Sequence, residues 1–242
     1  MRIRVINPNT TPSMTSTIER CAGAVAAPGV SIDAVTAAMG PASIESHYDE
    51  ILSGPGILAA IAQGERAGAD GYVIACFGDP GLDAARELAR GPVIGIAEAA
   101  MRTATHLGRG FSVVTTLART IGRAEDLADR YGVRRYCRGI HACELPVLAL
   151  ESDPRARKIV LEACRAAVDA DGSDVVVLGC AGMADLCAEI ADEIGVPVID
   201  GVAAATLTVQ ALVTLGLRKS GRGEFAAPRR KSYAGLLSEF GA

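Results

Sequence analysis

The feature that most constrains this chain is a nine-residue pattern that occurs twice, once in each half. The copies are residues 70–78 and residues 174–182. In both, an aspartate leads into an apolar run that ends at a cysteine, and a glycine follows two positions later. A continuous apolar run of this length is typical of a parallel strand that is buried on both faces. We therefore expect each half to deliver one thiol, Cys76 or Cys180, to the carboxyl end of a strand, where open α/β sheets bind ligands.

Strand and helix patterns alternate along the whole chain, in the same order in both halves. We predict strands over residues 3–6, 30–35, 72–76 and 92–96, and again over 111–115, 133–140, 175–180 and 196–200. Helices are predicted over 11–26, 48–67, from Asp79-Pro80 onward, through Ala100 and His106, over 119–131, from Asp153-Pro154 to Ala170, and around Leu186 and Ile190. Asp79 is predicted to cap the helix that follows it, with Pro80 at the first helical position.

Repeated strand–helix–strand crossovers produce parallel sheets covered by helices. The chain is therefore predicted to be an α/β protein of two similar open parallel-sheet domains, related by a pseudo-twofold axis, with the active site in the cleft between them. The first domain is predicted to span 1–97 plus 204–242, and the second 98–203. We interpret the tail, 218–242, as a solvated segment or a flap on a neighbouring molecule, because its basic residues 229–231 have the pattern of a solvated charge run.

The composition restricts the partners and the location. A net charge of −4 gives no reason to expect nucleic acid or an anionic membrane as a partner. Every long apolar stretch is interrupted by glycine or charge, and residues 1–10 do not have the form of a signal peptide. We therefore expect a cytoplasmic protein whose seven cysteines are reduced. Their spacing contains no Cys-x-x-Cys pair and no zinc pattern, so no metal is expected.

Two thiols facing one cleft suit the removal and return of a proton α to a carbonyl. A thiolate can accept the proton on one face of a flat carbanion while a thiol donates on the other face. A free cysteine, with a pKa of about 8.5, is only a few per cent ionised at neutral pH. Because a helix is predicted to begin just after each cysteine, we expect helix N-termini to favour both thiolates. The N–H groups at 77–78 and 181–182 are predicted to hold the enolate oxygen.

Other residues have ordinary structural explanations that compete with functional ones. Cys21, Cys164 and Cys187 lie on apolar helix faces and are expected to be core residues. The polar clusters at 7–10 and 115–116 follow the first strand of each half, where they either contact substrate or cap helices.

The three histidines, His47, His106 and His141, lie in unrelated places, so we predict surface or core roles for them and neither a Cys–His pair nor a metal site. Glu98 and Asp200 follow the fourth strands and are expected to act as caps or surface residues.

No cofactor is predicted. The lysines Lys158, Lys219 and Lys231 stand outside the strand-end motifs, which argues against a Schiff base with pyridoxal phosphate. The first strand is not followed by a G-x-G-x-x-G pattern, and the chain contains no P-loop.

With these segments taken together, the chain resembles the aspartate/glutamate racemase superfamily. It is most similar to the hydantoin racemase branch, which includes allantoin racemase. The resemblance spans nearly the whole chain and rests on residues 5–10, 74–81, 92–100, 114–116, 177–183 and 197–200. Residues 141–151 and the basic tail are more similar to the allantoin racemase arm, which slightly favours allantoin as the substrate.

The resemblance implies a cofactor-independent racemase with two catalytic cysteines that inverts C5 of a 5-substituted hydantoin, and it implies a homo-oligomer. It assigns the catalytic role to Cys76 and Cys180. It implies substrate contacts at Asn7, Ser43, Phe77, Thr115, Thr116 and Ala181.

Two alternatives remain open from the sequence. One is a related amino-acid racemase, an arylmalonate-type decarboxylase or a maleate-type isomerase, although decarboxylation requires only one thiol. The other is a ligand-binding or redox-sensing protein whose cleft cysteines form a reversible disulfide.

Overall fold

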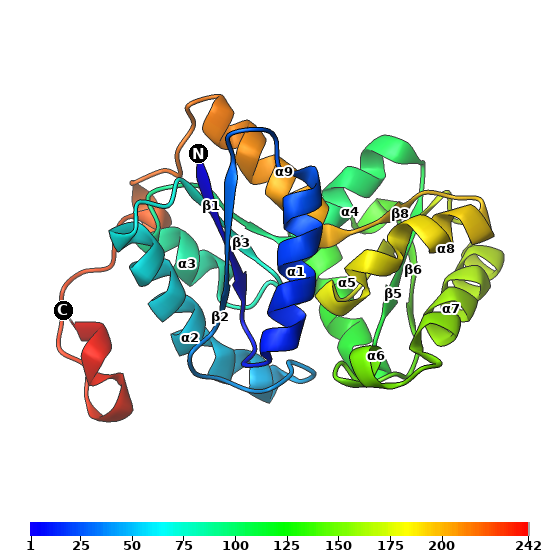
Figure 1. Ribbon diagram of the computed structural model, residues 1–242, viewed down its shortest axis with the longest axis horizontal. Coiled ribbons are helices and arrows are strands. Elements are labelled where there is room, and N and C mark those ends of the chain that lie inside the picture. The colour runs from blue at the N-terminus through cyan, green and yellow to red at the C-terminus, as the bar shows by residue number, and fades with distance from the viewer. Residues whose placement is uncertain (242) are drawn as a thin grey trace.

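A computed structural model of the protein describes residues 1–241 and shows two lobes side by side (Figure 1). Residue 242, the end of the predicted first domain and of the tail, lies outside the described residues. Each lobe contains a four-stranded sheet, with strand order β2-β1-β3-β4 in the first and β6-β5-β7-β8 in the second. All neighbouring strands are parallel. Because the two orders coincide when each half is counted from its own first strand, the predicted α/β fold of two similar parallel sheets is confirmed.

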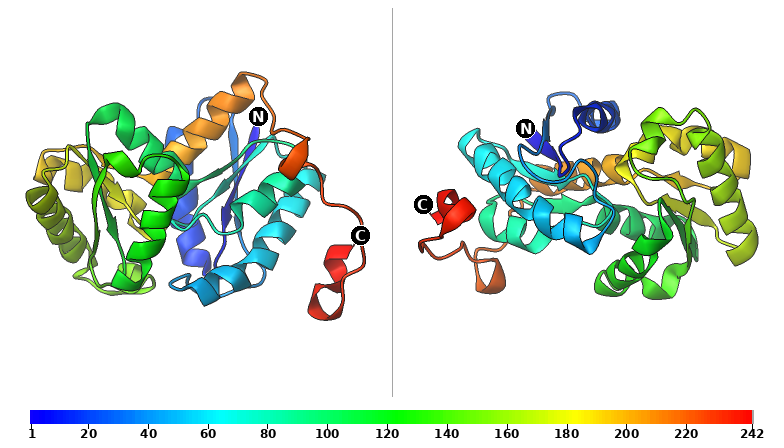
Figure 2. Two further views of the ribbon diagram at one scale, coloured as in Figure 1. Left: turned by 180° about the vertical axis from the view of Figure 1, so that it is seen from behind. Right: turned by 90° about the horizontal axis from the view of Figure 1, so that it is seen from below.

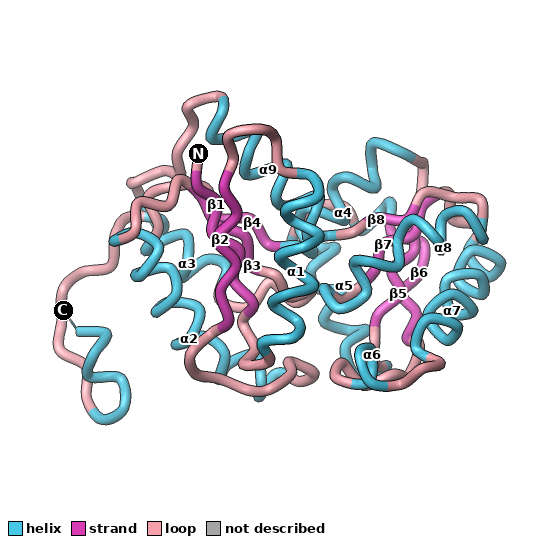
Figure 3. The backbone as a smooth tube through the Cα atoms, in the orientation of Figure 1, coloured by secondary structure: helices cyan, strands magenta, loops and turns pink. Residues whose placement is uncertain are grey.

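Helices flank both sheets, as the tube drawing shows (Figure 3). The strands are β1 (Arg2–Asn7), β2 (Ser31–Thr36), β3 (Gly71–Ile74), β4 (Val93–Gly95), β5 (Phe111–Thr115), β6 (Cys137–Ala142), β7 (Val175–Leu178) and β8 (Val198–Ile199). The helices are α1 (Pro12–Val25), α2 (His47–Arg66), α3 (Leu82–Leu88), α4 (Ile96–Leu107), α5 (Ile121–Arg130), α6 (Ala149–Ser152), α7 (Ala156–Asp171), α8 (Cys187–Ile194) and α9 (Gly201–Thr214).

Helices α4 and α9 cross from one lobe to the other. Helix α4 follows β4 of the first sheet, but its Met101 packs in one core with Phe111 of the second sheet. Helix α9 follows β8 of the second sheet, but its Val209 packs in one core with Ile3 of the first. Each half thus completes the core of the other half. The predicted division into 1–97 with 204–242 and 98–203, which assigns each of these helices to the sheet it covers, stays a prediction.

The two crossing helices meet where they begin. A Cβ placed on Gly201, the first residue of α9, would lie 2.7 Å from the carbonyl oxygen of Ile96, the first residue of α4. A real Cβ is not tolerated that close to a backbone oxygen, so this crossing requires a residue without a side chain. Asp200 caps α9 as expected, because its carboxylate accepts hydrogen bonds from the N–H groups of Val202 (2.7 Å) and Ala203 (3.2 Å).

The prediction that Asp79 caps the helix that follows it is wrong. Helix α3 begins at Leu82, after Gly81 with φ of 64°. Asp79 has φ of 45°, and its buried carboxylate accepts hydrogen bonds from Ala97 N–H (3.0 Å) and Glu98 N–H (2.9 Å) in the first turn of α4. Asp79 therefore caps α4 instead of α3. The N-cap residue of α4 is Gly95, which has no side chain that could accept these hydrogen bonds.

The carboxylate of Asp79 also reaches the second lobe. It accepts a hydrogen bond from the Tyr131 hydroxyl at 2.5 Å. A Cβ on Gly95 would lie 2.1 Å from the carboxyl carbon of Asp79, so the absence of a side chain there makes room for this arrangement. The strand predicted over 133–140 is also displaced, because residues 134–136 form a 3-10 turn and β6 begins only at Cys137.

The C-terminal tail runs along the outside of the first lobe and then projects from it (Figures 1 and 2). The Lys219 ammonium anchors its first part by donating to the carbonyl oxygens of Glu87 (3.1 Å) and Phe225 (2.5 Å). Farther along, residues 229–231 are exposed, in agreement with a solvated segment.

We predict that Asp79→Asn lowers the free energy of unfolding by about 2 kcal/mol, because an amide cannot accept all three of these buried hydrogen bonds. Asparagine keeps the size of the side chain and tolerates the left-handed backbone. Urea denaturation measures the change. Asp83→Asn, at an exposed position on α3, is the control and should cost less than about 0.5 kcal/mol. Equal stability of the two variants would contradict the role of Asp79.

Candidate active site

A cavity of about 170 Å³ lies between the lobes, at the carboxyl ends of both sheets. Its wall includes the last residue of β5 and residues from the segments after β1, β3, β5 and β7: Asn9, Ala75, Cys76, Phe77, Gly78, Thr115, Thr116, Gly179, Cys180 and Ala181. The right panel of Figure 2 looks onto the end of the molecule where these segments meet. Parallel strands bring their carboxyl ends to one edge, so the duplicated fold directs the same loops of both halves to one place.

The two cysteines of the repeated pattern lie on the wall of this cavity, one from each lobe. Strands β3 and β7 end at Ile74 and Leu178, so each cysteine stands two residues beyond its strand. Both side chains are partly buried free thiols. The backbone N–H of the glycine two positions later lowers the pKa of each thiol, Gly78 acting on Cys76 and Gly182 on Cys180. This repeated glycine therefore serves the sulfur directly.

Burial dominates the ionisation of both thiols. It raises the pKa of Cys76 well above the usual range, and the neighbouring Cys180 and Asp79 raise it further. Burial also raises the pKa of Cys180 to about 12, although its hydrogen bond from Gly182 acts in the opposite direction. The expectation that a helix begins just after each cysteine is wrong for Cys76, because α3 begins six residues later. Cys180 is the N-cap residue of the 3-10 helix Ala181–Leu186, and the Gly182 N–H in its first turn lowers the pKa of this thiol, but burial outweighs that effect.

Of the predicted substrate contacts, Phe77, Thr115, Thr116 and Ala181 line the cavity. The Thr115 hydroxyl forms a hydrogen bond with that of Thr120, 2.9 Å away.

Asn7 and Ser43, by contrast, lie outside the lining of the cavity. Asn7 is fully buried, and its amide nitrogen donates to Asn9 Oδ1 (3.0 Å), Thr11 O (3.1 Å) and Thr15 Oγ1 (3.0 Å). Asn7 thus supports Asn9, which does line the cavity. Direct substrate contact by Asn7 or Ser43 is not supported by this geometry.

The loop that contains Ser43 reaches the cavity a few residues later, through Ile44, Glu45, Ser46 and His47. Ser46 is the N-cap residue of α2, since its hydroxyl accepts from Asp49 N–H (3.2 Å), and the Asp49 carboxylate accepts from the N–H of Glu45, the residue before the cap (3.1 Å). The spacing of Ser46 and Asp49 is visible in the sequence and could have located this end of the loop. The Glu45 carboxylate then accepts the N–H of Val147 from the other lobe at 2.7 Å.

Two arginines of the second lobe, Arg119 and Arg123, also line the cavity. Arg123, on α5, pairs with the Glu50 carboxylate of α2 and donates to the carbonyl oxygen of Gly78 at 2.5 Å. Sequence analysis missed both residues, because no local pattern indicates that α5 faces α2 across the cleft.

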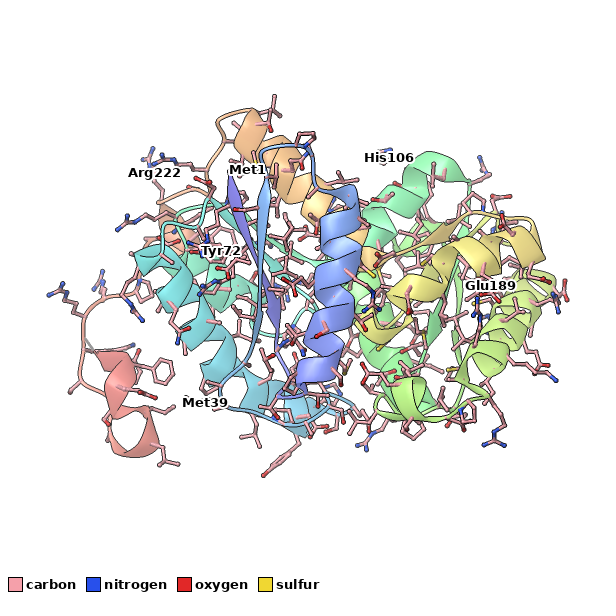
Figure 4. The ribbon with its side chains drawn as sticks, in the orientation of Figure 1. Met1, Met39, Tyr72, His106, Glu189 and Arg222 are labelled. Carbon is pink, nitrogen blue, oxygen red and sulfur yellow. The ribbon has the colours of Figure 1, made fainter. Side chains whose placement is uncertain are left out.

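The three histidines lie on different elements, and one of them has a position that the sequence did not indicate. His106 lies at the outer end of α4, remote from the cavity (Figure 4), and His141 bonds to Asp171 at 2.7 Å. His47 is largely exposed but borders the cavity, which the sequence did not indicate. Within residues 1–241, no three His, Cys, Asp or Glu side chains are grouped to hold a metal ion. No helix in this part of the chain is both long and apolar enough to cross a membrane.

Comparisons with known proteins concern the whole chain. Residues 3–209 match the model of the Asp/Glu/hydantoin racemase family. The chain is 49% identical over 236 residues to a hydantoin racemase of Rhizobium meliloti, which covers 97% of this chain and 98% of that protein. It is 46% identical over 242 residues to a hydantoin racemase of Pseudomonas sp. strain NS671, with 100% and 97% coverage.

Among solved structures, an allantoin racemase from Klebsiella pneumoniae superposes with a TM-score of 0.96 at 51% identity, covering 98% of both chains. A second allantoin racemase, from Pseudomonas fluorescens, has a TM-score of 0.93 at 38% identity and covers 97% of this chain and 100% of its own. The predicted family and the predicted enzyme class, an isomerase, are confirmed: the chain belongs to the Asp/Glu/hydantoin racemase family.

Proposed function

We propose that this protein inverts the configuration at C5 of a 5-substituted hydantoin through two cysteines and without a cofactor. The observation that carries the proposal is the position of Cys76 and Cys180, which come from opposite lobes to the wall of one cavity. The relatives that are 40–49% identical are named hydantoin racemases, which supports the substrate class.

The proposed reaction needs one thiolate and one thiol. In one direction, the thiolate of Cys76 removes the C5 proton, and the electron pair of the C–H bond moves into the ring as an enolate. The thiol of Cys180 then gives its proton to the opposite face of C5 and becomes a thiolate. The product has the opposite configuration, and the enzyme is left ready for the reverse direction. Protons and charge balance over each turnover, so no oxidant or reductant is required.

The hydrogen bonds from Gly78 and Gly182 support the two cysteines in this role. A hydrogen bond to a sulfur stabilises the thiolate more than the thiol, because the acceptor carries the charge. These two N–H groups therefore serve the bases. This modifies the expectation from the sequence, in which N–H groups at 77–78 and 181–182 hold the enolate oxygen.

We further propose that the C5 substituent is polar, as the ureido group of allantoin is. Glu45, His47 and Arg119 border a cavity of only about 170 Å³, which favours a compact substituent with hydrogen-bonding groups over a large apolar one. The allantoin racemases among the similar structures support this choice. The homo-oligomer and the cytoplasmic location stay predictions.

A one-thiol reaction is a weaker proposal. Arylmalonate decarboxylase shares the fold, with a TM-score of 0.63 at 18% identity. Decarboxylation needs a single proton donor, whereas this cavity has a thiol from each lobe.

Either Cys76→Ala or Cys180→Ala should lower the racemisation rate of allantoin by at least about 10²-fold, because each removes one of the two proton-transfer groups. Polarimetry of a single enantiomer follows the rate. Each variant should still exchange the C5 proton of one enantiomer with heavy water, and the two variants should prefer opposite enantiomers. Cys21→Ala, in the second half of α1 and outside the lining of the cavity, is the control. Full racemisation by Cys180→Ala would contradict the proposal.

The racemisation rate at low substrate concentration should rise with pH between 7 and 9, with no plateau in that range. The raised pKa values of both thiols mean that the thiolate fraction still increases about tenfold per pH unit there. The measurement is kcat/KM against pH, corrected for the uncatalysed rate in buffer. A plateau that begins near pH 6 would instead indicate a thiol with a lowered pKa.

A further inference from the structure

Arg123 joins the two lobes next to one of the two cysteines. From α5 of the second lobe, its guanidinium pairs with the Glu50 carboxylate on α2 of the first lobe. The side chains of Arg123 and Glu50 are 19% and 25% exposed, so solvent weakens this pair less than it weakens the pairs on the surface. The same guanidinium donates to the carbonyl oxygen of Gly78 at 2.5 Å.

Gly78 connects Arg123 to Cys76. Its carbonyl oxygen accepts a hydrogen bond from Arg123, and its backbone N–H lowers the pKa of the Cys76 thiol. A Cβ on this residue would lie 2.8 Å from Nε of Arg123, so glycine permits the close approach of the guanidinium. The orientation of the N–H toward Cys76 thus depends on a side chain of the opposite lobe.

The buried position of Arg123 leaves one of its nitrogen atoms unpaired within residues 1–241, which costs free energy of folding. Its Nε is buried and has no hydrogen-bond partner among the described residues. A buried donor without a partner is unusual in a folded protein. The cost is consistent with a guanidinium whose place is determined by Glu50 and Gly78.

The other cysteine has different surroundings. The nearest atoms to a Cβ placed on Gly182, the residue that corresponds to Gly78, are methyl carbons of Leu150 (3.1 Å) and Met14 (3.6 Å). The backbone beside Cys180 is thus packed by apolar groups, whereas the backbone beside Cys76 is bound by a cation. The symmetry of the fold does not extend to this feature of the site.

We propose that Arg123, anchored by Glu50, is a positioning residue that holds the Gly78 N–H on the sulfur of Cys76 and so serves proton transfer at Cys76 but not at Cys180. The role of Arg123 in catalysis rests on the proposed two-cysteine racemisation. Its effect on the reactivity of the two thiols does not depend on the substrate.

The overall racemisation rate cannot reveal this asymmetry. The two enantiomers have equal free energies in an achiral solvent, so kcat/KM must be the same in both directions whatever the two bases contribute. The two thiols therefore have to be measured separately.

Thiol alkylation separates them without a substrate. Iodoacetamide reacts with the thiolate, and peptide mass spectrometry of the full chain gives the rates at Cys76 and Cys180 at pH 8. Arg123→Met should slow alkylation of Cys76 about 10–100-fold, the factor expected for a lost hydrogen bond to a charged group, and should change Cys180 by less than about threefold. Glu50→Gln should act in the same direction by a smaller factor.

Arg130→Met is the matched control. Arg130 is also on α5 and also pairs across the lobes, with Asp83 of α3, but this pair is about half exposed. Its loss should leave both alkylation rates within about twofold of the wild type. Thermal melting of each variant shows that it is folded. Equal slowing of both cysteines by Arg123→Met, or no slowing of Cys76, would overturn the proposal.

Proton exchange at C5 provides the catalytic readout. In the Cys180→Ala background, where Cys76 is the remaining base, Arg123→Met should lower exchange of allantoin about 10–100-fold. In the Cys76→Ala background it should lower exchange by less than about threefold. If the wild type does not act on hydantoins while alkylation still shows the asymmetry, the proposed function fails and the positioning role of Arg123 stands. If exchange falls equally in both backgrounds, the positioning role fails.

Discussion

The rest of the structure depends on the buried carboxylate of Asp79. This residue stands three positions after Cys76, yet it caps α4, the helix that leaves the first sheet to cover the second, and it binds Tyr131 of the second lobe. One side chain therefore fixes the loop that presents the thiol, the crossing of the chain and the orientation of the opposite lobe. A serine or threonine hydroxyl could cap α4 but would leave fewer acceptor sites for Tyr131, and the φ of 45° favours aspartate or asparagine among residues with a side chain.

The site combines two demands that oppose each other. A thiolate in a cavity from which water is excluded is a stronger base toward a carbon acid, but the same burial raises the pKa of each thiol and so lowers the fraction that is ionised. The backbone N–H groups of Gly78 and Gly182 lower the pKa values of the two thiols, and glycine at these positions allows the backbone to approach the sulfur atoms closely. These N–H groups offset part of the cost of burial. The remainder limits the thiolate fraction at neutral pH, so that proton transfer requires a substrate whose C–H bond is acidic.

The sequence was sufficient to predict the fold, because its decisive features are local and repeated. Two buried strands that each end before a cysteine and a glycine imply parallel sheets, and the duplication implies that their carboxyl ends share a cleft. What could not be predicted depends on contacts between distant segments. Asp79-Pro80 has the pattern of a helix start, and only the position of α4 shows that the carboxylate acts elsewhere. Asn7 has the place expected of a ligand contact, but three hydrogen bonds direct its amide inward to Asn9. The pairing of Arg123 with Glu50 spans both lobes and has no signature in either helix.

The duplication predicts symmetry, and the site departs from it for a reason that the reaction itself allows. A racemase must handle both enantiomers, but thermodynamics equalises kcat/KM in the two directions and places no such condition on the two bases. One thiol can therefore stand beside a peptide held by a cation, and the other beside one packed by methyl groups, as Gly78 and Gly182 do. Since only the equality of kcat/KM in the two directions is required, each lobe is free to diverge around its own cysteine. The close approach of Arg123 to Gly78 is such a divergence, because a side chain of the second lobe binds the loop that carries Cys76 in the first lobe.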